Sequence, residues 1–127
     1  MPGRSGKLEE ALACFRQVHD LRARLATGEH AGPPERLELA GSDYNLACCY
    51  ALFAAAIRKD DKRPAVLRSE EGEKLAREAM QSLRRAKANG YFAVPANRKQ
   101  LDKDTDLDSL RTRADYKAFL ATLPKSH

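Results

Sequence analysis

The stretch from Tyr44 to Ile57, YNLACCYALFAAAI, constrains the fold more than any other part of the sequence. It would form a helix with apolar residues on nearly every side, and such a helix has to be covered on more than one face. No apolar run in the chain reaches the roughly 18 residues that a membrane span requires. We therefore expect this segment to form the centre of a helical domain.

Length and composition narrow the class of protein. The chain has 127 residues, of which 32% are charged and 6% aromatic, and it contains no Trp. This length suits one modest domain and is too short for a barrel enzyme or a two-domain nucleotide enzyme. The core then has to consist mainly of Leu and Ala, as in a small soluble helical protein. The formal net charge of +5 is spread along the chain, which argues against nucleic acid as the main partner.

The three cysteines indicate a reducing compartment. Their number is odd, and Cys48 and Cys49 are neighbours, a pattern that does not suit a disulfide framework. The N-terminal sequence MPGRSGKLEEA lacks the apolar segment of a secretory signal. We therefore expect a cytoplasmic protein that does not contact a membrane.

Hydrophobic periodicity predicts three longer helices. Apolar residues recur at steps of three and four over 7–26, and the run Gly32-Pro33-Pro34 separates this helix from the next. The second predicted helix covers 35–59 and contains the apolar stretch. The third covers about 64–89, and a proline at its first position costs no hydrogen bond.

Two glycines bear on the course and the end of the third helix. Gly72 weakens the first half of the helix, so its start lies between Pro64 and Ser69. Gly90 comes after the helix, where a left-handed backbone ends a helix at little cost. Beyond Gly90 we expect an extended strip docked on the core and then short helices, over 91–95, 97–103, 107–112 and 114–123. No segment competes as a β-strand, so the predicted fold class is all-α.

Motifs in these helices resemble the tetratricopeptide (TPR) repeat. The second helix has the Asn-Leu-small…Tyr pattern of the first helix of a repeat, in Asn45, Leu46, Ala47 and Tyr50. The third has the small-large-small pattern of the second helix of a repeat, in Ala79, Leu83 and Ala86. The helix over 7–26 fits the same second-helix pattern through Gly6, Leu8, Ala11, Phe15 and Val18.

The chain also departs from the TPR pattern. Asp43 stands where a repeat often has Trp, and Tyr91 stands near its proline position. The distance from Tyr50 to Ala79 is longer than a repeat of about 34 residues contains. The resemblance is therefore to a degenerate repeat.

The runs YNLACCYAL, RRAKANGYF and DTDLDSLRTRADYKAFLATL are similar to the closing unit of TPR regions in bacterial serine/threonine protein kinases. The resemblance implies one TPR-like domain of antiparallel helical hairpins over 1–127. Residues 7–26 would be the second helix of a partial repeat, 35–89 a degenerate repeat with a long insertion, and 91–123 a C-terminal cap. The chain has no Gly-rich phosphate loop, HRD or DFG, so we expect no kinase activity.

The chain begins on what resembles the second helix of a repeat. We therefore expect it to be a segment of a longer protein, and its N-terminal helix to carry a bare apolar stripe at Leu8, Phe15 and Leu21. A homodimer through this helix, in which each copy covers the other, is one alternative.

No group of residues in the sequence points to an enzyme, a cofactor or a metal. The acidic run over 102–108 fails as a calcium loop, because neither register supplies the required Gly and Glu. We expect this run to cap helices and to pair with Arg111 and Arg113. Cys14 and His19 lie five positions apart, so they point in different directions from one helix and do not form a nucleophile–base pair.

Two surfaces are candidates for binding. The TPR resemblance places a partner-binding groove on the second helix, lined by Tyr44, Asn45, Cys48, Ala51 and Leu52. The alternative for these positions is that the C-terminal segment covers them as core. The densest basic positions, Arg58, Lys59, Arg84, Arg85 and Lys87, form either a strip for phosphate or acidic peptides or a solvated surface.

The function predicted from the sequence is a non-catalytic protein–protein interaction module, regulatory or scaffolding, in a larger bacterial signalling kinase. Its partner would be a protein or peptide. Two alternatives remain open at this point. In the first, the chain is a purely structural cap of a longer helical solenoid. In the second, it is a basic module that contacts nucleic acid or an anionic surface.

Overall fold

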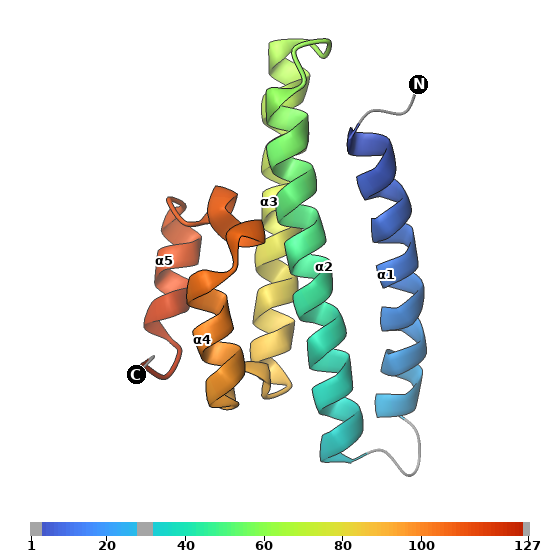
Figure 1. Cartoon of the computed structure of the whole chain (residues 1–127), viewed down its shortest axis with the longest axis vertical. Helices are drawn as coiled ribbons and strands as arrows, with labels where there is room; N and C mark the ends of the chain where they lie inside the picture. Colours follow the sequence, from blue (N-terminus) through green and yellow to red (C-terminus); the bar gives the residue numbers. More distant parts are fainter. Residues whose placement is uncertain (1–3, 28–31, 126–127) are drawn as a thin grey trace.

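The computed structural model describes residues 4–27 and 32–125, with side chains from residue 7 onward. Within these residues every regular element is helical, so the predicted all-α class is confirmed. The three longer helices are α1 (Arg4–Ala26), α2 (Pro33–Lys59) and α3 (Ala65–Ala88). α2 and α3 pack as an antiparallel hairpin, and α1 lies along the other side of α2 (Figure 1).

Local chemistry accounts for the ends of the long helices. α2 begins with Pro33 and Pro34, and the Glu35 carboxylate accepts a hydrogen bond from the Gly32 backbone N–H at 2.7 Å. α3 begins directly after Pro64, the earlier of the two predicted starts, so Gly72 does not delay it. Gly90 has φ 90° and ψ 8°, which confirms the predicted left-handed position after α3.

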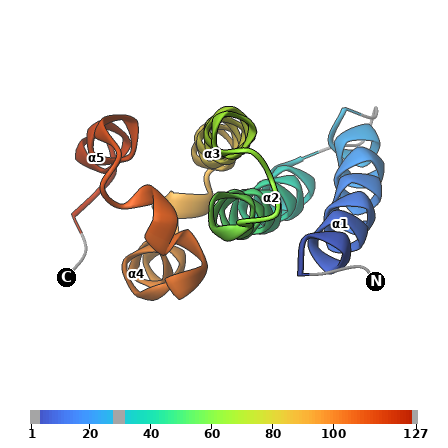
Figure 2. The same cartoon turned by 90° about the horizontal axis from the view of Figure 1, so that it is seen from above.

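The C-terminal segment folds into short helices and turns that pack on one side of α2 and α3 (Figure 2). The expected extended strip over 91–95 is wrong. Val94 alone in that segment has an extended backbone, because Gly90 turns the chain into a 3₁₀ turn and Pro95 starts a helix at its first position. The elements are the 3₁₀ turn η1 (Tyr91–Ala93), α4 (Pro95–Lys103), the 3₁₀ helix η2 (Thr105–Leu110) and α5 (Ala114–Ala121).

α2 is the central helix, as its sequence predicted. α1, α3 and the C-terminal segment each cover one side of it. Alanines at the closest approaches have no exposed surface, among them Ala47 and Ala54 on α2 and Ala79 on α3. On the C-terminal side the core is aromatic, and the Phe92 ring packs edge-on against Phe119 with 5.8 Å between centroids. Small residues between the long helices let them approach closely, and aromatic rings fill the wider space on the side of the C-terminal segment.

A helix that spans a bilayer has to be long and apolar, which sets a demand on the described helices. None of those within 4–27 and 32–125 is both long enough and apolar enough to span a membrane.

Candidate protein-binding surfaces

The C-terminal segment covers most of the groove that the TPR resemblance placed on α2. Tyr44, Cys48 and Ala51 are buried beneath it, whereas Asn45 and Leu52 are exposed. The buried positions are fixed by polar contacts as well as packing. The Tyr44 hydroxyl donates to Asp104 Oδ2 at 2.7 Å, and the Ser109 hydroxyl donates to the Ala51 carbonyl at 3.1 Å. The structure therefore divides the five groove candidates into a covered set and an exposed pair.

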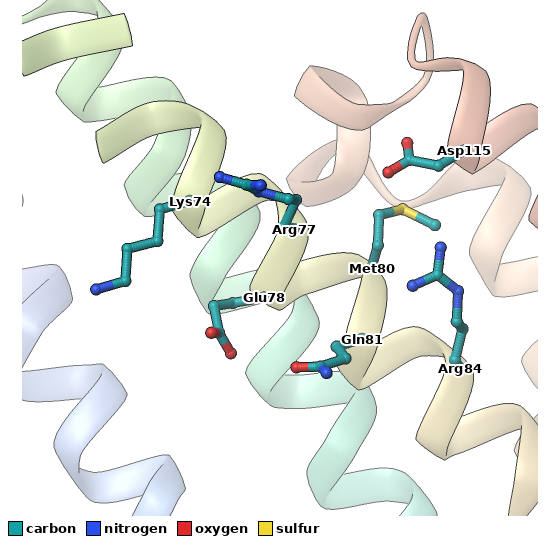
Figure 3. A pocket seen from close by; sticks show the side chains of 7 residues that line it. All are labelled: Lys74, Arg77, Glu78, Met80, Gln81, Arg84 and Asp115. Carbon is teal, nitrogen blue, oxygen red and sulfur yellow. The ribbon is translucent and has the colours of Figure 1, made fainter. Parts of the chain in front are cut away.

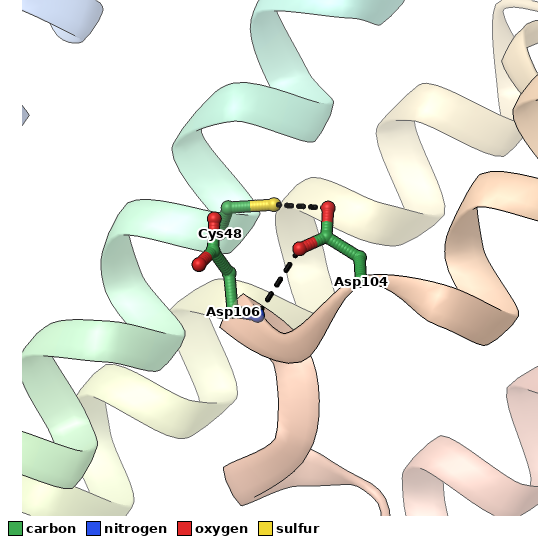
Figure 4. A group of neighbouring side chains, drawn as sticks. All are labelled: Cys48, Asp104 and Asp106. Atoms are coloured by element: carbon green, nitrogen blue, oxygen red, sulfur yellow. Dashed lines mark hydrogen bonds between the residues drawn. The ribbon is translucent and has the colours of Figure 1, made fainter.

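Asp104 is the polar centre of this covered contact. Besides the Tyr44 hydroxyl it accepts the Cys48 thiol at 3.6 Å and, through Oδ1, the Asp106 backbone N–H at 3.1 Å (Figure 4). Burial, with the nearby carboxylates, raises the pKa of Tyr44 and the pKa of Cys48 well above their usual values. Both groups are therefore neutral donors at neutral pH. The predicted capping role of the acidic run is confirmed at Asp104, which caps η2.

Cys48, Asp104 and Asp106 are close enough to be considered as metal ligands. Their Sγ and carboxylate oxygens lie within 4.8 Å of one another, which holds for no other such group among the described residues. A structural zinc site uses four ligands, and this group offers three. The thiol already donates its proton to Asp104, so hydrogen bonding accounts for the geometry.

A fully buried carboxylate lies on α2, where it faces α1 and α3. Asp43 is 1% exposed, and its Oδ1 lies 2.8 Å from His19 Nε2 on α1 and 3.2 Å from Arg85 Nε on α3. Its Oδ2 is buried and has no hydrogen-bond partner among the described residues. Burial raises the pKa of Asp43 despite both neighbours. At the position where a TPR repeat often has Trp, this chain thus joins three helices through one carboxylate.

α1 is attached to α2 by a small apolar contact and by several polar contacts. Leu12 is its one buried apolar side chain among residues 7–26. Arg16 donates to the Tyr50 hydroxyl at 2.7 Å and stacks over that ring, and Arg22 donates to the Ser42 hydroxyl at 3.2 Å. Leu8 and Ala11 also pack partly against the core, and the remaining apolar surface of α1 is not used in this contact.

That unused surface forms an open apolar face on α1. Phe15, Val18, Leu21 and Leu25 are 36%, 41%, 59% and 61% exposed. Their spacing of three and four places them along one side of the helix. The predicted bare stripe is found at Phe15 and Leu21, while Leu8 is partly covered. Contiguous exposed apolar surface of this kind marks interaction sites in soluble proteins.

A smaller apolar hollow lies where the start of α1 meets the end of α2. It has a volume of about 360 Å³ and includes Leu52, the exposed groove candidate. Its walls are Leu8, Leu52, Ala55 and Ala56, with Lys7 and Lys59 beside them. None of the four side chains of the open face lines this hollow.

The predicted basic positions do not form one strip. Arg58 and Lys59 lie at the end of α2, close to the start of α3, while Arg84 and Lys87 lie near the end of α3, at the other end of the hairpin. Arg58 lies 3.8 Å from Glu73, and Arg85 is engaged with buried Asp43. Arg84 and Lys87 instead line a groove between α3 and α5.

This α3–α5 groove consists of two hollows of about 450 Å³ and 480 Å³ that share Arg84 and Asp115. Figure 3 shows Met80 and Arg84 extending from α3 toward Asp115 on α5. Asp115 is held by Arg113 at 2.9 Å, which also pairs with Glu73 of α3 at 2.7 Å. The full lining is Lys74, Arg77, Glu78, Met80, Gln81, Arg84, Lys87 and Ala88 on α3 and Asp115, Ala118, Phe119 and Thr122 at α5.

Several of these residues were not singled out from the sequence. Lys74 and Arg77 lie three apart on α3, and Arg77 lies seven before the predicted Arg84, which is a detectable signal for a shared helix face. Asp104 could not be assigned in this way, because Tyr44, the partner that orients it, lies far away in the sequence. Asp115 pairs with nearby Arg113, but the contact of Arg113 with distant Glu73, which ties this pair to α3, has no local signal.

The chain was compared with known proteins. No family model matches it, and neither the curated proteins nor the solved structures include a match.

Proposed function

We propose that this chain is a non-catalytic protein–protein interaction module of the TPR-like kind. The observation that carries the proposal is the open apolar face of α1, where four large side chains remain 36–61% exposed. The rest of the chain has a well-packed core, so the exposure of these four side chains does not come from a failure to fold. A helix with such a face binds another helix or an apolar segment through residues at steps of three and four.

The packing of the α2–α3 hairpin supports the TPR-like part of the proposal. Ala47, Ala79 and Ala86, the small residues of the resemblance, have no exposed surface, and Leu83 is fully buried. These are the positions at which a repeat needs small residues for close helix approach. The similarity of the C-terminal runs to kinase-associated TPR regions is the basis for proposing a regulatory or scaffolding role in a bacterial, cytoplasmic signalling kinase.

The test is affinity capture of proteins from a bacterial lysate on the immobilised chain, in which the wild type is compared with two double variants. Leu21→Glu with Leu25→Glu changes the open face of α1. Val66→Glu with Leu67→Glu changes two apolar residues that are 67% and 45% exposed at the start of α3. We expect both variants to keep the helical circular-dichroism spectrum of the wild type, and only the α1 variant to lose the captured protein.

Other outcomes would redirect the proposal. Equal capture by both variants contradicts a binding role for α1. Capture that disappears with nuclease or moderate salt supports a basic module for nucleic acid, because counterion release makes such binding strongly salt-dependent. If the molecular mass of the wild type in solution doubles as its concentration rises, and the α1 variant stays monomeric, a second copy of the chain is the partner.

One observation favours a second candidate, the structural cap. The C-terminal segment buries Tyr44, Cys48 and Ala51, so it closes the side of α2 where a TPR repeat presents its groove. A terminal unit of a helical solenoid needs such a cover to stay soluble. Under this candidate α1 packs on a preceding repeat of the same protein, and the isolated chain captures no other protein.

A further inference from the structure

The α3–α5 groove is a second open surface, well separated from the face of α1. α1 packs on α2, whereas α5 lies beside α3 at the other end of the helical layer (Figure 2). Its two hollows adjoin at Arg84 and Asp115, which line both of them. Along α3 the groove extends from Lys74 to Ala88, which is about 21 Å at 1.5 Å per residue. That length accommodates about four turns of a helix.

The walls of the groove carry an excess of cations. Lys74, Arg84 and Lys87 make no salt bridge to any residue in the described part of the chain. Arg77, by contrast, lies 3.6 Å from Glu73. The lining also holds two carboxylates, Glu78 and Asp115, of which Asp115 is paired with Arg113. The pairing lowers the pKa of Asp115, so this carboxylate stays ionised and occupied by its own arginine.

The floor of the groove is apolar. Met80 and Phe119 close its base, and Ala88 and Ala118 leave room above them. Met80 and Phe119 are buried, so the apolar surface open to a ligand is that of the exposed Ala88 and Ala118, which a ligand carrying only negative charge would leave in contact with water. A ligand that carries both acidic and large apolar side chains would satisfy the walls and the floor together.

We propose that the α3–α5 groove binds an acidic amphipathic segment of a partner protein, in which Asp or Glu residues flank large apolar side chains. Arg84 and Lys87 pair with the acidic residues, and the apolar side chains lie over Ala88 and Ala118. The inference rests on the proposed binding role of the chain and specifies the chemistry of one partner. It does not depend on the face of α1.

The experiment begins with a phage-displayed library of random 16-residue peptides selected on the wild-type chain. We expect the selected peptides to be enriched in Asp or Glu beside Leu, Ile or Phe. One selected peptide is then synthesised with a fluorescent label, and its affinity is measured by anisotropy for the wild type and for two double variants.

The two variants carry the same change in charge. Arg84→Glu with Lys87→Glu changes the groove, and Arg36→Glu with Lys62→Glu changes two exposed cations outside it. We expect the groove variant to lose at least tenfold in affinity and the control to change less than threefold. Replacing the acidic residues of the peptide with Lys should restore binding to the groove variant, which a general loss of net charge would not do.

Several results would overturn the inference. One is a library that yields no peptide whose binding depends on the groove, and another is a tenfold loss in the control variant as well. A third is a single-stranded oligonucleotide that displaces the peptide and binds the groove more tightly than it does. The α1 variant separates the two proposals, since Leu21→Glu with Leu25→Glu should leave the affinity for this peptide unchanged.

Discussion

Gly72 offers a quantitative test of how α2 and α3 fit together. It lies inside α3, where glycine is less favourable than alanine by about 1 kcal/mol. The Arg58 side chain of α2 crosses directly over it. A β-carbon built at Gly72 would lie 2.7 Å from both Cγ and Nε of Arg58 and 3.2 Å from its Cδ. The substitution Gly72→Ala therefore combines a gain in helix propensity with a steric conflict.

The two effects are similar in size. Moving Arg58 away from its rotamer costs about 0.5–1.5 kcal/mol. The move also removes the contact between Arg58 and Glu73, which is worth about 0–1 kcal/mol for such partly exposed side chains. We expect Gly72→Ala to be neutral or to destabilise the wild type by about 1 kcal/mol. In an Arg58→Ala background the same substitution should stabilise the chain by about 1 kcal/mol.

Urea unfolding followed by far-ultraviolet circular dichroism measures the four free energies of this double-mutant cycle. The expected coupling between the two positions is about 1–2 kcal/mol. Arg77→Ala provides the matched control, because Arg77 also lies near Glu73, at 3.6 Å, but does not approach Gly72. If Gly72→Ala stabilises the wild type as much as the Arg58→Ala protein, then Arg58 does not occupy the space above Gly72 and the prediction is wrong.

Three further predictions concern buried positions. Burial raises the pKa of Asp43 above 3.8, so the wild type should lose stability relative to Asp43→Asn as the pH rises from about 4 through the folded-state pKa. Urea unfolding of both proteins at pH 4 and pH 7 measures the change, and a difference in unfolding free energy that does not depend on pH contradicts the prediction. Tyr44→Phe removes the hydrogen bond to Asp104 and should cost about 1–2 kcal/mol in urea unfolding, whereas no loss would mean that the bond is not made in solution. Ala79→Leu places a large side chain where no surface is exposed and should lower the unfolding free energy by about 1–3 kcal/mol; a stability equal to the wild type would show space between α2 and α3.

The long helices were predictable because their signals are local. Periodicity over 7–26 and 35–59 gives the faces of α1 and α2, and Gly90 marks the end of α3 by its own backbone preference. The segment over 91–95 was predicted wrongly, because its aromatic and β-branched residues favour an extended chain by propensity. Its actual conformation is set by the turn at Gly90 and by the docking of Tyr91, which stacks on Tyr44 at 4.9 Å between ring centroids.

The candidate surfaces were predictable only in part, for the same physical reason. A helical pattern shows which residues share a face, but the partner of that face depends on contacts across long distances in the chain. Tyr44 and Asp104 are 60 residues apart, and Asp43 meets Arg85 across 42. The predicted salt bridges of the acidic run illustrate this limit. Arg111 pairs with Asp108 as expected, whereas Arg113 pairs with Glu73 of α3 and with Asp115.

The cover that η2 and its neighbours place on α2 has a consequence for biosynthesis. Ala51 accepts its hydrogen bond from Ser109, which the ribosome adds 58 residues later. At about 5–20 residues per second, this apolar side of α2 waits roughly 3–12 s for its cover. During that interval one apolar side of α2 lacks its cover, while α1 and then α3 become available to cover the other sides. We therefore expect this side of α2 to be open to chaperones until the C-terminal segment has been synthesised.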